Sequence, residues 1–356
     1  MSPTITRRTI LAGAAAAATG RGALAQTGPL NVGFVYVGPT GDHGWTYAHD
    51  RARKHLEAAL GDRVKTSFVE NVAEGPDAER VIRQLAQAGN QLIFTTSFGF
   101  MNPTIRVARQ FPKVYFEHAT GYQRAANVAT YNARFYEGRA VIGTIAGHMS
   151  RTGVAGHIAS FPIPEVVMGI NAFTLAARKV NPAFRTRVLW VSSWYDPAKE
   201  ADAAKALIDQ GCDVLTQHTD SAAALQACES RGLYAFGQAS DMTAFAPKAH
   251  LTAIVDEWGP YYVERARAVL EERWTSSDTW HGIKEGLVVM SPYNAAVPEP
   301  VRAAADAVRD GIVAGTLHPF TGPIRDQKGE VRIAAGATAS DEMMAKMDWY
   351  VEGVQS

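Results

Sequence analysis

The sequence has little of what would direct it to a nucleic acid or into a membrane. Its 356 residues include 35 basic and 35 acidic side chains, and the first 25 residues hold three arginines and no acid. The remainder therefore has a net charge of −3, which gives no electrostatic case for a nucleic acid or an anionic membrane as partner. No apolar run reaches the roughly 20 residues that a membrane-spanning helix needs.

Motifs of catalysis and metal binding are also missing. The chain contains neither G-x-S-x-G, the turn that exposes a nucleophilic serine, nor the zinc motif H-E-x-x-H. Its two cysteines, Cys212 and Cys228, lack the spacing of a zinc ligand set. An oxidising compartment would permit a disulfide between them, but two separate thiols are the preferred interpretation. We expect no enzyme activity, no metal and no cofactor.

The N-terminus has the pattern of an export signal. Two consecutive arginines stand in T-R-R-T-I-L, a short apolar stretch follows over 10–18, and A-L-A at 23–25 is a small-x-small cleavage site. No cysteine stands at that site, so no lipid anchor is expected. We predict a twin-arginine signal peptide over residues 1–25 and a soluble periplasmic protein that starts near Gln26.

Beyond the signal, short apolar runs alternate with amphipathic helical segments. The runs are continuous rather than alternating, which is typical of strands buried on both faces of a parallel sheet. Strand–helix–strand repetition favours right-handed crossovers, and the number of strands favours two α/β lobes over one sheet. The predicted strands cover 31–37, 65–70, 91–96, 113–119, 127–132, 153–160, 187–193, 212–217, 234–239, 251–256 and 286–292, and predicted helices include 46–60, 77–89, 103–110, 135–150, 165–180, 198–210, 221–231 and 259–273.

The loop GPTGDHGWTYAHD, residues 38–50, follows the first predicted strand. Its three glycines fit neither nucleotide-binding pattern and it has no lysine, so a phosphate site is not favoured. His43 and His49 are six residues apart and do not share a helical face as a metal-binding pair would. Asp42 and Trp45 remain, one carboxylate and one large aromatic ring at a strand-to-helix turn. They favour a clamp for a flat ligand.

Other aromatic residues also fall in loops that follow predicted strands. In open parallel sheets, ligands sit beyond the carboxyl ends of the strands. Phe98 in TTSFGF and Trp194 in SSWYDP are expected at that edge, together with His118 in EHAT. Several aromatic side chains and a few polar groups there are typical of a slot for a planar heterocycle. His118 could donate to a ring nitrogen, or it could be a buried histidine satisfied by the backbone.

Five segments carry a family resemblance, and they occur along the chain in this order: DHGW (42–45), YNARFYEGRAVIGTIAGHMS (131–150), FPIPEVVMGINAFTLAARKVNP (161–182), DQGCDVL (209–215) and FGQASDM (236–242). Together they resemble the motifs of the basic membrane protein (Bmp) family over about residues 30–325. The resemblance implies the fold of type I periplasmic binding proteins, with two doubly wound parallel-sheet lobes joined by a three-crossover hinge. It also implies a receptor that delivers purine nucleosides or similar heterocycles to an ABC importer.

The resemblance implies roles for individual residues. Asp42 would hold the polar edge of the ring or a sugar, and Asp241 would accept hydrogen bonds from the ligand. Trp45 and Trp194 would hold the ring between them. An ionised carboxylate accepts two or more hydrogen bonds, and such charge-assisted bonds are strong. The alternative is that both aspartates only cap the helices that follow them.

Departures from the family pattern bear on the ligand. Asp256 stands at the end of LTAIV where the family often has a lysine, Thr46 replaces an asparagine, and FGQASDM lacks the usual first aspartate. More carboxylates favour a ligand rich in N–H donors, and tryptophan leaves less room for a ribose than phenylalanine. We expect a free purine base, adenine first, with a nucleoside or a flavin as the alternative. Asp256 could instead only cap its helix.

The resemblance also divides the chain into lobes. Residues 26–131 and 254–284 would form lobe 1, residues 132–253 and 285–325 lobe 2, and residues 326–356 an extension packed on the lobes. The ligand would close the lobes by contacting both of them. The expected partner is an ABC permease in the inner membrane, bound by a monomer, and a role as ligand sensor for a membrane kinase stays open. A nucleoside hydrolase is not supported.

Overall fold

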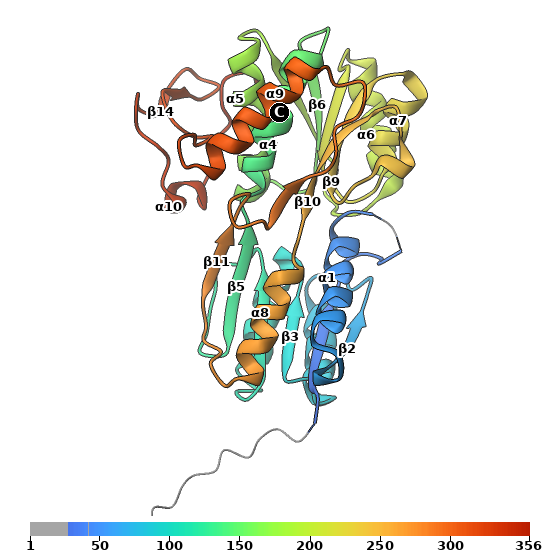
Figure 1. Cartoon of the computed structure of the whole chain (residues 1–356), viewed down its shortest axis with the longest axis vertical. Coiled ribbons are helices and arrows are strands. Elements are labelled where there is room, and N and C mark those ends of the chain that lie inside the picture. Colours follow the sequence, from blue (N-terminus) through green and yellow to red (C-terminus); the bar gives the residue numbers. More distant parts are fainter. Residues whose placement is uncertain (1–27, 42) are drawn as a thin grey trace, which may run out of the picture.

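The structure, a computed structural model, describes residues 28–41 and 43–356. Two α/β lobes lie end to end along the long axis of the molecule, and the chain passes between them three times (Figure 1). The predicted signal peptide and the predicted ligand residue Asp42 lie outside the described residues. In the described part of the chain, no helix is both long and apolar enough to cross a membrane.

The first lobe, at the lower end of Figure 1, is built on a six-stranded sheet in which every pairing is parallel. One pair of helices packs on each face of this sheet. In spatial order the strands are β11 (Asp278–His281), β5 (Val128–Ala133), β4 (Tyr115–Ala119), β3 (Leu92–Thr95), β1 (Leu30–Val35) and β2 (Val64–Val69). The helix pairs are α1 (Trp45–Leu60) with α8 (Gly259–Leu270) and α2 (Pro76–Gln87) with α3 (Met101–Ala108). Two short 3₁₀ turns, η1 (Gly61–Arg63) and η2 (Phe98–Phe100), complete the lobe.

The second lobe has a seven-stranded sheet, parallel except for one antiparallel edge strand, β12. Its helices again cover both faces, so that the central strands β8 and β10 are buried along their whole length. In spatial order the strands are β12 (Val288–Met290), β10 (His250–Asp256), β9 (Tyr234–Ala239), β8 (Val214–His218), β6 (Val154–Ala159), β7 (Arg185–Trp190) and β15 (Val354–Gln355); the helices are α4 (Phe135–Met149), α5 (Pro164–Val180), α6 (Pro197–Asp209), α7 (Ala223–Arg231) and α9 (Glu299–Val313), with a 3₁₀ turn η3 (Thr243–Phe245).

Three short passages connect the lobes. The chain crosses after β5, between β10 and α8, and between β11 and β12. In the structure β10 continues in the second sheet to Asp256, beyond the boundary expected at residue 253. β11 lies beside β5 in the first sheet, although no strand was expected over 278–281.

The C-terminal segment packs on the second lobe. It contains β13 (Ile324–Arg325), β14 (Val331–Ile333) and α10 (Asp341–Met344), and its last strand, β15, joins the edge of the second sheet beside β7. Met344, Met347 and Val351 are buried against α5, in one cluster with Val166 and Met168. This segment therefore completes the core of the second lobe.

The observed elements follow the expected pattern of continuous apolar runs. Each of the eleven predicted strands corresponds to an observed strand, which confirms the expected α/β class with mainly parallel sheets. Proline at the first or second helical position starts α2, α5, α6, α8 and α9, because its missing N–H costs nothing there. Cys212 and Cys228 are both buried free thiols, and burial raises the pKa of Cys228 to about 12.

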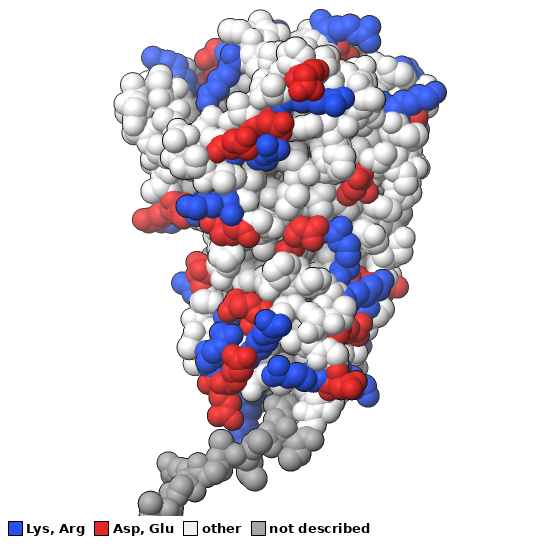
Figure 2. All heavy atoms as spheres, in the orientation of Figure 1, with Lys and Arg blue, Asp and Glu red and all other residues white. Residues whose placement is uncertain are grey.

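Charged side chains do not gather by sign on the surface in view. Figure 2 shows Lys and Arg interspersed with Asp and Glu over both lobes. Many of them form pairs, for example Arg134 with Asp341 at 2.6 Å and Arg51 with Glu257 at 2.5 Å. The visible face therefore has no single-sign patch of the kind that binds nucleic acid.

Candidate ligand-binding site

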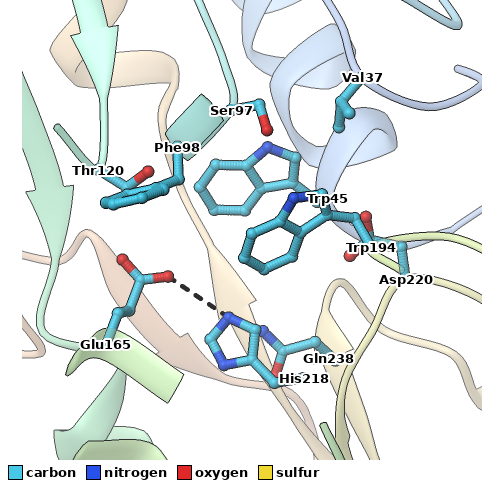
Figure 3. A pocket seen from close by; sticks show the side chains of 10 residues that line it. All are labelled: Val37, Trp45, Ser97, Phe98, Thr120, Glu165, Trp194, His218, Asp220 and Gln238. Carbon is cyan, nitrogen blue, oxygen red and sulfur yellow. Dashed lines mark ion pairs between the residues drawn. The ribbon is translucent and has the colours of Figure 1, made fainter. Parts of the chain in front are cut away.

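A cavity lies between the lobes, where the carboxyl ends of both sheets face each other (Figure 3). The space among its lining side chains is about 370 Å³ when the part open to solvent is included. The side chains that line it come from α1, from the start of α5, and from the ends of strands and the loops that follow them. The first lobe contributes Val37, Trp45, Ser97, Phe98 and Thr120, and the second contributes Glu165, Trp194, His218, Asp220 and Gln238.

Trp45 presents its indole to the cavity from the first residue of α1. Its Nε1 donates a 2.6 Å hydrogen bond to the carbonyl oxygen of Thr96, just beyond β3. Phe135 and Trp258 meet the indole edge-on, with ring centroids 6.0 and 5.6 Å away. Because the polar atom is satisfied within the protein and other rings hold the indole, Trp45 forms a fixed apolar wall.

Trp194 faces the same cavity from the loop after β7, in the other lobe. Its Nε1 donates to Glu74 Oε1 of the first lobe over 3.1 Å. The same carboxylate accepts from Ser97 Oγ at 2.6 Å and from the Gly99 backbone N–H at 2.9 Å. The second-lobe ring Phe161 lies 5.0 Å from the Trp194 indole. The nitrogen of Trp194 therefore ties the lobes together while its ring lines the cavity.

A second contact between the lobes lies at the N-terminus of α1. The Gly44 backbone N–H donates to Ser240 Oγ over 2.8 Å, and the Trp45 backbone N–H interacts with the Asp220 carboxyl group. Gly44 has a φ of +108° and passes so close to the Asp220 carbonyl oxygen that a Cβ there would lie 2.2 Å from it. The structure thus shows the lobes in contact, in a closed arrangement.

His218 and Glu165 lie at the side of the cavity opposite Phe98 (Figure 3). His218 Nε2 is 3.4 Å from Glu165 Oε1. Burial lowers the pKa of His218, and the neighbouring Glu165 carboxylate offsets part of that effect. Glu165 Oε2 and His218 Nδ1 are buried without a hydrogen-bond partner among the described residues. Such buried groups are costly unless something satisfies them, so they mark an edge where a ligand's polar atoms would be bound.

Asp220 adds a second carboxyl group to the cavity, beside Trp194 and across from Glu165 in Figure 3. Burial raises its pKa well above the usual value, and repulsion from Glu200 raises it further, while the Trp45 backbone N–H acts in the opposite direction. A raised pKa favours the protonated form over a wider range of pH. A protonated carboxyl group both donates and accepts a hydrogen bond, which pairs well with an amidine-like edge of a heterocycle.

Gln238 is oriented by a buried arginine. Arg139, fully buried on α4, donates through Nη2 to Gln238 Oε1 and to the carbonyl oxygen of Gln217, and through Nη1 to Thr216 Oγ1. Because an arginine only donates, the amide oxygen of Gln238 must face Arg139. Its NH₂ group is then left to donate into the cavity that Gln238 lines.

Strained backbone gathers at the same edge of the sheets. Thr120, Ser192 and Ala239 have φ values of +62°, +52° and +60°, and they lie at the ends of β4, β7 and β9. A left-handed backbone costs a non-glycine residue about 1–3 kcal/mol and is common at ligand sites. Thr120 itself lines the cavity. The strain therefore supports this edge as the functional one.

A family model agrees with the fold and the cavity. Residues 30–314 match the model of the Bmp family, described as PnrA-like ABC transporter substrate-binding proteins. The chain belongs to the Bmp family. It is accordingly a substrate-binding protein of an ABC transporter and not an enzyme, as the resemblance implied.

Individual relatives of this Bmp protein span most of its length. A purine-binding protein of Brucella abortus (strain 2308) is 60% identical over 91% of this chain and 93% of its own. A Haloferax volcanii protein, whose name assigns it to glucose binding in an ABC transporter, is 35% identical over 92% of this chain and 80% of its own. A solved ABC solute-binding protein of Aeropyrum pernix K1 shares the fold, with a TM-score of 0.71 at 18% identity over 84% of this chain and 93% of its own.

The structure brings three of the residues proposed from the sequence together. Trp45, Phe98 and Trp194 all line the cavity. His118 lies beneath it, fully buried, with Nδ1 3.0 Å from Thr95 Oγ1 and a pKa lowered to about 3 by burial. It is not among the lining residues, so the structure places it behind the wall of the cavity.

Two of the proposed aspartates are placed differently. The carboxylate of Asp241 accepts from the backbone N–H and the hydroxyl of Thr243, at 2.9 and 2.6 Å, which is the capping alternative, and it does not line the cavity. Asp256 is fully buried at the end of β10, and neither carboxyl oxygen has a hydrogen-bond partner among the described residues. Burial and the nearby Glu165 raise the pKa of Asp256 well above its usual value.

Sequence reasoning proposed none of the six polar, non-indole side chains that line the cavity among the described residues, namely Ser97, Thr120, Glu165, His218, Asp220 and Gln238. Most of them stand at the ends of predicted strands or in the loops after them, so position alone could have identified these. Position does not say which of several polar residues in a loop turns inward. That choice depends on contacts such as the one between Arg139 and Gln238.

Proposed function

We propose that this chain captures a purine between its lobes, a free base such as adenine first, and delivers it to an ABC permease. The observation that supports this most is the 60% identity to a protein named as purine-binding, which extends over nearly all of both chains. The cavity suits that class of ligand, because it combines two indole walls with polar side chains from both lobes. No catalytic step and no cofactor is part of the proposal.

The chemistry of the cavity suits a purine ring. Trp45 and Trp194 offer flat apolar faces, and stacking on aromatic side chains is worth about 1–3 kcal/mol per base. Glu165 Oε2 accepts hydrogen bonds, as adenine's exocyclic amine and imidazole N–H require. Gln238 would donate to a ring nitrogen through its NH₂ group. A protonated Asp220 carboxyl group would both donate a hydrogen bond to the ligand and accept one from it.

Closure of the lobes would trap the base. The hydrogen bonds from Trp194 to Glu74 and from Gly44 to Ser240 form only when the lobes meet. A ligand that contacts both lobes stabilises this closed form by its differential affinity. The closed form, a monomer outside the cytoplasmic membrane, would then dock on the permease. The predicted periplasmic location after twin-arginine export is part of this proposal.

Two other ligand classes have support. A nucleoside would need space beyond the base, and a second chamber shares Phe98, Thr120 and Glu165 with the cavity. The relative named for glucose raises a sugar as a ligand. A flavin, or a sensing role beside a membrane kinase, rests on the fold class alone and is less favoured.

Calorimetric titration of the purified protein with adenine, adenosine and glucose tests the proposal. Adenine should bind most tightly, and Trp45→Ala and Trp194→Ala should each weaken it about 5- to 150-fold, the equivalent of about 1–3 kcal/mol. Trp349→Ala is the matched control, because Trp349 packs in the C-terminal segment away from the cavity and should leave adenine affinity unchanged. Tighter binding of adenosine than of adenine would mean that the ligand is a nucleoside and not a free base. Tighter binding of glucose than of either would contradict the purine proposal.

A further inference from the structure

A second chamber borders the cavity at Phe98. It measures about 700 Å³, including space open to solvent, and shares Phe98, Thr120 and Glu165 with the first cavity. Figure 3 shows Phe98 and Thr120 side by side, with the Glu165 carboxylate facing them across the gap. A ligand whose ring lies between the tryptophans could therefore extend a substituent past these residues into the chamber.

The walls of the second chamber are mainly apolar. Ile163, Pro164 and Met168 come from the start of α5, Trp280 from β11, and Tyr122 from the loop after β4. Tyr122 is 68% exposed, the largest exposed fraction among the large hydrophobic side chains of the described residues. An exposed aromatic ring next to an apolar pocket is expected to gain from being covered by an apolar group.

The polar side chains of the chamber are largely engaged within the protein. Asp278 pairs with Arg124 at 2.8 Å and accepts from Thr130 Oγ1 at 2.7 Å. The amide oxygen of Asn132 accepts from the Ala133 backbone N–H at 2.7 Å. Apart from Glu165 Oε2, which borders both cavities and is proposed to accept from the purine, the hydroxyls of a ribose would find few free partners here. A buried hydroxyl without a partner is costly. The chamber thus favours an apolar group over a sugar.

We infer that the second chamber is a subsite for an alkyl or aryl substituent carried by the purine. The inference rests on the proposed function, because it places the ring of the same ligand in the first cavity. It extends the ligand class from the free base to substituted bases of low polarity. Apolar area removed from water would supply the added affinity.

Titration with adenine, N6-benzyladenine and 9-benzyladenine tests this subsite, since the two isomers direct the same group from different ring positions. At least one isomer should bind about ten-fold more tightly than adenine. Ala345→Trp should abolish that gain, because Ala345 is exposed at the C-terminal end of α10 and lines the chamber but not the first cavity. Adenine itself should bind this variant as it binds the wild type.

Ala314→Trp is the matched control. Ala314 is also an exposed alanine in right-handed conformation at a helix C-terminus, that of α9, and it lines neither cavity. It should leave all three affinities unchanged. The proposed subsite is wrong if neither benzyl isomer binds more tightly than adenine. It is also wrong if Ala345→Trp lowers the affinity for adenine as much as the affinity for its derivatives. Failure of adenine to bind the wild type would instead contradict the proposed function.

Discussion

The indole nitrogen of Trp194 in the second lobe donates to Glu74 Oε1 in the first lobe over 3.1 Å. Glu74 is held in place by Ser97 and Gly99, which donate to the same oxygen atom. A wall of the cavity is therefore also a link between the lobes. Ligand affinity should depend on this link even where the ligand does not touch it.

Glu74→Gln should weaken adenine binding about five-fold, because removing the charge weakens a bond that forms only in the closed form. Hydrogen bonds to charged groups contribute about 1.5–3 kcal/mol, and the exposure of Glu74 reduces this to about 1 kcal/mol. Glu70→Gln is the control, since Glu70 accepts two bonds from Thr40 within the first lobe. Calorimetry on Trp194→Phe and on the double variant checks the cause: fully additive losses would show that the two residues act separately.

Gly44→Ala should prevent full closure. A Cβ on Gly44 would lie 2.2 Å from the Asp220 carbonyl oxygen, across the cleft. Relieving such a clash costs about 1–3 kcal/mol, so adenine affinity should fall about 5- to 150-fold. Small-angle scattering with saturating adenine should show a larger radius of gyration for the variant than for the wild type.

The control separates this clash from backbone strain. Gly75 precedes α2 as Gly44 precedes α1, has a similar φ of +94°, and has no atom within 4 Å of a Cβ position. Gly75→Ala therefore introduces the same kind of strain in the first lobe without a contact across the cleft. Equal losses of affinity in the two variants would mean that strain alone, rather than blocked closure, is responsible.

The sequence predicted the elements of the fold well and the site only in part. The strand expected over 251–256 is β10, His250–Asp256, because a continuous apolar run has few alternatives to a buried parallel strand. Short edge strands such as β11 and β15 were missed, since they carry little apolar pattern and form through pairing with a distant strand. Local pattern does not encode such long-range pairing.

The site shows the same division. Trp45 and Trp194 could be proposed because several aromatic residues follow strands at the same predicted edge and because the family resemblance implies the role. His218 and Glu165 could not, because they meet only when α5 and β8 pack in the second lobe. Asp241 stood at the expected edge, but its carboxylate accepts from the backbone N–H and hydroxyl of Thr243 at the start of η3. Position along a strand predicts the edge, and only packing decides the direction of each side chain.

Asp256→Asn should stabilise the protein at neutral pH. Burial and repulsion from Glu165 raise the folded-state pKa of Asp256 well above its usual 3.8, and Arg139 offsets this only in part. An unfolded chain releases this proton near pH 3.8, whereas the folded protein retains it to higher pH. Wild-type stability therefore decreases as pH rises between the two pKa values, and asparagine removes that dependence.

Thermal unfolding between pH 4 and 8, without ligand, measures this effect. The Tm gain of Asp256→Asn should be smallest near pH 4 and should increase toward neutral pH. Asp213→Asn is the contrasting variant, because the Asp213 carboxylate accepts from Ser150 Oγ and from the backbone N–H groups of Arg151 and Thr152. Asp213→Asn replaces this charged acceptor by a neutral amide, so its Tm at pH 7 should be lower than that of the wild type. A Tm gain for Asp256→Asn that increases toward acid pH would mean that folding lowers the pKa of Asp256 instead of raising it.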